Sequence, residues 1–125
     1  MLVRLACPND DEAIWRLMEP TFVVEDEKEI VGTYHLRPNT SGGSAHVANI
    51  GYMTSAEAVV KGVGRRMVEH SLQRARERGF KAVQFNFLVS TNERAVRLYK
   101  DYGFDIIGTL PLAFLHPKRG YVDVL

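Results

Sequence analysis

The feature that most constrains the fold is a change of pattern around two closely spaced glycines. An apolar, strand-like run covers residues 47–53, and a long amphipathic run ends at Gly79. Between them stands the segment VVKGVGRR, residues 59–66, in which Gly62 and Gly64 alternate with a lysine and a valine. A strand that leads through glycines into an amphipathic helix predicts a crossover connection of an α/β protein.

The two glycines also indicate a chemistry. The N–H groups of the first helical turn have no partner within a helix, and the helix dipole adds partial positive charge there. Glycines leave those groups uncovered, so we predict a cradle for a pyrophosphate; the alternative is a helix start that binds no ligand. Other nucleotide motifs fit worse, because Met67 stands where a dinucleotide fingerprint needs its third glycine and no Gly-Lys-Ser/Thr triplet occurs.

Length and composition limit the classes to which the chain can belong. Its 125 residues suit one domain, residues 1–125, and a content of 46% hydrophobic and 25% charged residues is that of a globular protein. Sixteen basic and fifteen acidic residues give a net charge of +1, which argues against binding nucleic acid through bulk charge. The single cysteine, Cys7, fits a reducing compartment, and neither a membrane span nor a signal peptide is evident. We therefore expect a cytoplasmic location and no membrane partner.

The first half of the chain predicts an antiparallel meander. Its expected elements are a strand at residues 2–5, a helix from Asn9 or Asp10 to Glu19, and strands at residues 22–24, 30–36 and 46–53. The charged segment 25–29 and the proline- and glycine-containing segment 38–44 provide the turns.

The second half predicts crossovers. Its expected elements are helices at residues 62–78 and 92–102, each capped by a following glycine, and strands at residues 81–89, 104–110 and 121–125. A loop that contains Pro111 and His116-Pro117 is expected before the last strand. The expected fold class is α/β, with a mixed, mostly antiparallel sheet of about six to seven strands flanked by about three helices.

A second motif lies in residues 90–104, which read STNERAVRLYKDYGF. Asn92, Ala95, Leu98 and Tyr99 reproduce N-x-x-A-x-x-L-Y, a signature of the GNAT acetyltransferase superfamily. The phosphate motif of that family, Q/R-x-x-G-x-G/A, is matched at both glycines by VVKGVG. From about residue 21 to its end, the chain therefore resembles a GNAT protein. The resemblance implies the GNAT fold, an acyl-CoA-dependent N-acyltransferase activity, and acetyl-CoA or another acyl-CoA as co-substrate.

The resemblance also assigns residues to coenzyme A. The amides of the glycine motif would hold the pyrophosphate, two arginines would add charge, and the edge of the preceding strand would pair with the pantetheine arm. Asn92 would contact the pantetheine region while it caps its helix; the alternative is a cap alone. The predicted CoA-binding residues are Tyr52, Met53, Thr54, Lys61, Gly62, Val63, Gly64, Arg65, Arg66 and Asn92.

Tyr99 is the predicted catalytic residue. Its phenol would give a proton to the departing CoA thiolate; the alternative is a packed aromatic ring. Asn49 and Asn86 interrupt two apolar strand runs, and they would bind the acceptor or else satisfy local polar groups. Segments such as YHLRPN and HPKRGYVD are similar to a branch that acetylates small amines and amino-acid analogues. A primary or secondary amine of a small molecule is therefore the expected acceptor.

The general base is not assigned by the sequence. Asn49 stands where many GNAT proteins carry a glutamate, and an amide cannot take up a proton. His46 is taken as the only histidine near that strand, and alternation places it on the opposite face. The four histidines lack metal-ligand spacing, so we predict no metal.

Two departures from the family pattern affect these expectations. Val59 replaces the usual Arg or Gln, which predicts weaker CoA binding. The segment before Phe22 leaves no room for a second helix of about 10–14 residues, which the family places there. The acceptor pocket is therefore expected to be more open than usual, or to be completed by another copy of the chain in a homodimer. The alternative function is a CoA-binding module with weak or lost catalysis, which serves sensing or assembly.

Overall fold

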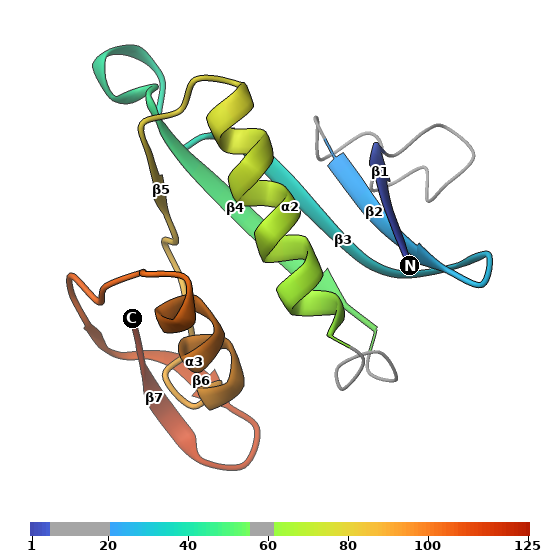
Figure 1. Cartoon of the computed structure of the whole chain (residues 1–125). Coiled ribbons are helices and arrows are strands. Elements are labelled where there is room, and N and C mark those ends of the chain that lie inside the picture. Colours follow the sequence, from blue (N-terminus) through green and yellow to red (C-terminus); the bar gives the residue numbers. More distant parts are fainter. Residues whose placement is uncertain (6–20, 56–61) are drawn as a thin grey trace. The chain divides into compact units, whose positions relative to one another are not determined.

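The computed structural model describes residues 1–5, 21–55 and 62–125 (Figure 1). The predicted helix that ends at Glu19 and the motif residues Val59 and Lys61 lie outside the described residues. The chain divides into two compact units, Met1–Gln84 and Phe85–Leu125.

The first unit is built on a five-stranded sheet in the order β1-β2-β3-β4-β5. Its elements are β1 (Leu2–Leu5), β2 (Thr21–Asp26), β3 (Glu29–Pro38), the short 3₁₀ helix η1 (Gly42–Ser44), β4 (Val47–Thr54), α2 (Val63–Glu77) and β5 (Ala82–Gln84). Strands β1 to β4 pair antiparallel, whereas β4 and β5 pair in parallel. The predicted meander and the mixed α/β sheet are therefore confirmed, and the crossover from β4 to β5 runs through α2.

Helix α2 lies lengthwise over β3 and β4 (Figure 1). One face of the helix is buried, and it consists of Val63, Met67, Val68, Ser71 and Ala75. Gly32 allows the close approach at this interface, because a Cβ there would lie 2.8 Å from Cγ1 of Val63. The opposing strand residues include Tyr34, Leu36 and Ile50, which are also buried. Each such side chain contributes roughly 1.5–3 kcal/mol when it leaves water.

Glycines delimit α2 at both ends. Gly62 precedes the helix with a φ of 77°, and Gly79 follows it with a φ of 83°. Both values lie in the left-handed region, which glycine adopts without the clash that a Cβ would cause. The predicted bounds of this helix are thus confirmed to within one residue at each end.

The second unit contains α3 (Glu93–Asp101) and a two-stranded sheet of β6 (Leu110–His116) and β7 (Gly120–Val124). The strand predicted at residues 104–110 is wrong, because residues 104–109 have no regular secondary structure. Asp105 and Gly108 interrupt the apolar alternation there, and pairing with β7 begins only at Leu110.

The segment at Pro111 is not the loop that the sequence predicts, but an irregular part of β6. The pairing register shifts between Leu110 and Phe114, and Leu112 adopts a positive φ of 51°. Its N–H donates to Oδ1 of Asp123 at 3.0 Å. A bulge of this kind lets a proline sit in a strand without interrupting the ladder on both sides.

The strand predicted at residues 81–89 is shorter than expected. Only Ala82–Gln84 pairs with β4, and Val89 instead forms a bridge with Val124 of the second unit. Residues of one apolar run therefore pair with two different strands, β4 and β7, and the periodicity of the run does not show where the first pairing ends.

Candidate functional site

The N-terminal end of α2 has the geometry of an anion site. The first hydrogen bond of the helix runs from N–H of Arg66 to the carbonyl of Gly62 at 3.1 Å, so the N–H groups of Val63 and Gly64 precede the helical ladder. The first turn contains no acidic residue. Arg65 and Arg66 are exposed beside it, and Arg66 also donates to the carbonyl of Met1 at 2.8 Å. Dipole and side chains therefore make this end electropositive.

The second feature is the edge of β4. The antiparallel ladder with β3 continues from Ala48 to Thr54, whereas the parallel ladder with β5 covers only Val47–Asn49. Past Asn49, β4 therefore runs on beyond the end of its ladder with β5. The predicted pantetheine contacts Tyr52, Met53 and Thr54 belong to this last part of β4, and the Met53 side chain is 63% exposed.

Two hydroxyl contacts join α2 to the sheet. The Tyr34 hydroxyl lies 2.6 Å from Nδ1 of His70, and the Tyr52 hydroxyl lies 2.6 Å from Oγ of Ser71. Because the Ser71 hydroxyl donates to the carbonyl of Val68 at 2.9 Å, Tyr52 is the donor to Ser71. Helix and strand are thus tied by directional bonds as well as by apolar packing.

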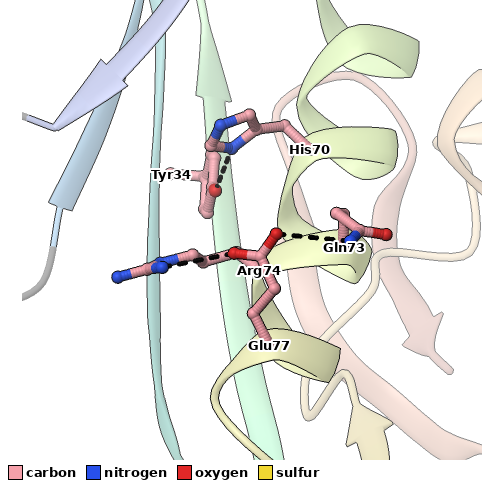
Figure 2. A network of polar contacts seen from close by, with 5 residues as sticks. All are labelled: Tyr34, His70, Gln73, Arg74 and Glu77. Atoms are coloured by element: carbon pink, nitrogen blue, oxygen red, sulfur yellow. Dashed lines mark hydrogen bonds and ion pairs between the residues drawn. The ribbon is translucent and has the colours of Figure 1, made fainter.

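Figure 2 shows that Tyr34 and His70 point toward one another. Burial raises the pKa of Tyr34, which keeps its phenol protonated, and burial lowers the pKa of His70, which keeps its imidazole neutral. The phenol therefore donates and Nδ1 accepts. Toward the C-terminal end of the helix, Glu77 accepts from Gln73 and Arg74 at 3.2 and 3.3 Å.

Of the predicted site residues in the second unit, two have clear local roles. The Asn92 side chain accepts from N–H of Ala95 at 3.2 Å, which confirms that it caps α3. Tyr99 contacts the rings of Phe85 and Phe104, with centroids 4.3 and 6.0 Å away. Burial raises the pKa of Tyr99, so the phenol holds its proton at neutral pH and can donate it.

The two candidate acceptor residues differ from their expected settings. Asn49 is half-buried on β4, and its Nδ2 donates to Oδ1 of Asn39 at 3.1 Å. This is the local satisfaction that the sequence left as the alternative. Asn86 lies outside any strand, in a bend, and is exposed. The expectation of a buried amide within a strand is therefore wrong at Asn86, because β5 ends at Gln84.

The sequence analysis did not identify His35 of β3 as a neighbour of β4. His46 is not the only histidine near β4, because His35 pairs directly with Gly51. The signal that would have identified His35 is the antiparallel register, counted from β4 back through the turn into β3. Among the described residues, no three His, Cys, Asp or Glu side chains are grouped as a metal would require. No helix in that part of the chain is long and apolar enough to span a bilayer.

Comparison with known proteins agrees with the two motifs and with the fold. The sequence profile described as the Acetyltransferase (GNAT) family matches residues 4–104. N-acetyltransferase aca1 of Schizosaccharomyces pombe is 31% identical over 104 residues, which are 82% of this chain and 50% of that protein. The chain thus spans half the length of this relative.

Solved structures share the fold. A GCN5-related N-acetyltransferase from Kribbella flavida has 37% identity and a TM-score of 0.85, over 98% of this chain and 78% of that one. YncA, a putative acetyltransferase from Salmonella typhimurium solved with its cofactor acetyl-CoA, has 18% identity and a TM-score of 0.83, over 99% and 90% of the two chains. As its motifs predict, the chain belongs to the GNAT acetyltransferase family.

Proposed function

We propose that this chain is an N-acetyltransferase that moves an acetyl group from acetyl-CoA to a primary or secondary amine of a small molecule. The observation that carries the proposal is the pairing of two features within one unit. A left-handed Gly62 opens an electropositive helix end, and β4 runs on beyond its ladder with β5 at Asn49. The first feature suits a pyrophosphate, and the second suits an extended chain of amides such as pantetheine.

The residues of the first unit take the cofactor roles in this proposal. The backbone amides from Lys61 to Arg66 hold the pyrophosphate, and Arg65 and Arg66 add charge pairing. The backbone of Tyr52, Met53 and Thr54 pairs with the pantetheine arm and polarises the thioester carbonyl. The bond from Tyr52 to Ser71 supports this role, because it turns the tyrosine side chain toward α2 and keeps it away from the strand edge.

The residues of the second unit take part in the transfer itself. The acceptor nitrogen attacks the thioester carbon, the carbon–sulfur bond breaks, and Tyr99 gives a proton to the leaving thiolate. Asn92 contacts the pantetheine region in addition to capping α3. Asn49 and Asn86 bind the acceptor, with Asn49 using the amide oxygen that its bond to Asn39 leaves for another donor.

Isothermal titration of acetyl-CoA, CoA and desulfo-CoA into the protein tests the cofactor, and a panel of small amines with detection of released thiol tests the transfer. Binding followed by acetylation supports the proposal. Absence of binding to all three compounds overturns it.

A second candidate function is a CoA-binding module without turnover, used for sensing or assembly. The amide at Asn49 favours it, because an amide cannot deprotonate an amine and this one is already bonded to Asn39. Tight binding of acetyl-CoA without acetyl transfer to any amine of the panel would establish the module and exclude the enzyme.

Assembly and location are further parts of the proposal. We propose that residues 1–125 act as one domain, that the protein works in the cytoplasm, and that a homodimer covers apolar residues of β6. Leu110, Leu112 and Leu115 support the dimer, because they are between 54% and 63% exposed. Size-exclusion chromatography at two concentrations tests it, and a strictly monomeric elution contradicts it.

A further inference from the structure

A row of residues crosses the face of the sheet that α2 does not cover. Thr21 of β2 pairs with His35 of β3, and His35 pairs with Gly51 of β4. Residues paired directly across antiparallel strands share a face. Tyr34 points to α2, so alternation along β3 places His35, and with it the whole row, on the opposite face.

The imidazole of His35 lies against the backbone of Gly51. A Cβ built on Gly51 would overlap Cε1 of the ring and would lie 2.9 Å from Nδ1 and 3.0 Å from Nε2. The ring edge that carries both nitrogens is therefore directed at β4. Gly51 is two residues past Asn49, where the ladder with β5 ends, and it directly precedes Tyr52, the first of the residues assigned above to pantetheine and the thioester.

Two side chains of the row have polar atoms without a hydrogen-bond partner among the described residues. Neither ring nitrogen of His35 has a hydrogen bond to another described residue, and Oγ1 of Thr21 is buried without a partner in the same part of the chain. A buried hydroxyl without a partner costs about 1–3 kcal/mol and calls for an explanation. Beside an imidazole that gains a second N–H on protonation, the Thr21 oxygen is a ready acceptor.

The charge around the ring favours its neutral form. Burial, and after it the positive charge of Arg37, lowers the pKa of His35 below its usual value. Among the described residues, β2 and β4 present the uncharged Thr21 and Gly51 to the ring, and Arg37 is the charged neighbour on β3. The imidazole is therefore neutral at pH 7 and able to take up a proton.

We propose that His35 is the general base of the transfer, and that the acceptor amine reaches the thioester from the face of the sheet that carries Thr21, His35 and Gly51. This inference rests on the proposed acetyltransferase function. The amine nitrogen forms a bond to the thioester carbon, the carbon–sulfur bond breaks, and the electron pair leaves with sulfur. The nitrogen gives its proton to His35 and the thiolate takes one up, so one proton moves in total from nitrogen to sulfur. Solvent returns His35 to its neutral form.

The experiment compares wild type with His35→Gln, with Arg37→Gln, and with His46→Gln as a matched control on an exposed histidine. Acetyl-CoA binding is measured by titration. The rates kcat and kcat/KM are measured with 2-phenylethylamine, or with the fastest acceptor of the amine panel, from about pH 5.5 to 9. Glutamine keeps hydrogen-bonding capacity at position 35 but cannot titrate.

In His35→Gln we expect unchanged acetyl-CoA binding, a kcat lower by about 100-fold or more, and loss of the acidic limb of the pH profile. Arg37→Gln removes the cation that lowers the pKa of His35, so its acidic limb moves to higher pH, which a purely structural role would not produce. Because Arg37 is exposed, this variant tests the base even if His35→Gln does not fold.

The outcomes separate the two proposals. An active wild type with unchanged rates and pH profile in His35→Gln, or with an unmoved acidic limb in Arg37→Gln, overturns the role of His35 alone. A wild type that binds no acetyl-CoA overturns the proposed function and this inference with it.

Discussion

Replacing Gly62 by alanine separates the cost of a strained backbone from the loss of a ligand site. The matched control is Gly79→Ala at the other end of α2. Both glycines have left-handed backbones, with φ of 77° and 83°, and at both a Cβ would meet no atom of the described residues within 4 Å. Each alanine substitution should therefore lower the free energy of unfolding by about 1–2 kcal/mol through the backbone alone. Denaturant unfolding should give nearly equal losses for the two variants.

Binding should distinguish them. At Gly62 the added methyl group occupies the open space beside the N-terminal end of α2, where the proposal places the pyrophosphate, and a hydrogen bond to a charged group contributes about 1.5–3 kcal/mol. Loss of one such bond weakens the Kd for acetyl-CoA by about 10–100-fold, since 1.4 kcal/mol corresponds to a factor of ten. Gly79→Ala should bind as wild type does. Equal affinities in the two variants, measured by titration calorimetry, would refute the assignment of the pyrophosphate to this helix end.

Three further predictions follow from the side chains. Tyr34→Phe leaves Nδ1 of His70 without its donor and should lower the free energy of unfolding by about 1–2 kcal/mol, whereas Tyr121→Phe, at an exposed ring, should change little; equal effects would speak against the buried bond. The pKa values of His35 and His70 are lowered in the folded protein, so the unfolded chain binds more protons in acid. The contribution of the two neutral imidazoles to stability is therefore complete above about pH 6.5 and decreases as the pH falls below that value. A free energy of unfolding in urea that does not change with pH would contradict this. Tyr99→Phe should lower kcat by about 100-fold without weakening acetyl-CoA binding, and full activity would remove Tyr99 from its assigned role.

Most of the first unit was predictable because local signals agree with one another there. The apolar stripe of α2 ends at two glycines whose left-handed backbones need that residue, so pattern and cap give the same bounds. The acidic turn between β2 and β3 also gave the correct hairpin. The positive φ values of 49° at Glu27 and 68° at Lys28 show that the turn forms even without the usual glycine.

The second unit was less predictable because its signals are not local. The bulge at Leu112 depends on Asp123, which lies eleven residues away and accepts from its N–H. Alternation of apolar residues cannot report such a partner, so β6 was placed too early and Pro111 was read as a loop. The shortness of β5 has a similar cause, because Val89 forms its bridge with Val124 and not with β4.

The residues of the candidate site also differ in whether local sequence could predict them. Gly62, Gly64 and Asn92 stand in motifs of fixed spacing, and Asn92 was predicted both as a cap and as a contact. His35 belongs to the segment YHLRPN, but that segment did not assign it a role; the role proposed for it rests on the register that sets it opposite Gly51. Register is fixed by the pairing of whole strands, and no window around His35 contains it.

The register of β3 and β4 also fixes the position of α2, through two hydrogen bonds of tyrosine hydroxyls. Tyr34 and Tyr52 occupy paired positions on β3 and β4, and they bond to the adjacent helix residues His70 and Ser71. Apolar packing alone would tolerate small shifts of a helix along a sheet, whereas two directional bonds from neighbouring strands define one position. That position sets the distance between the N-terminal end of α2 and the part of β4 that runs on beyond its ladder with β5. If acetyl-CoA spans these two features, the same bonds that stabilise the unit also prepare it to receive the ligand, and loss of either hydroxyl should weaken binding as well as stability.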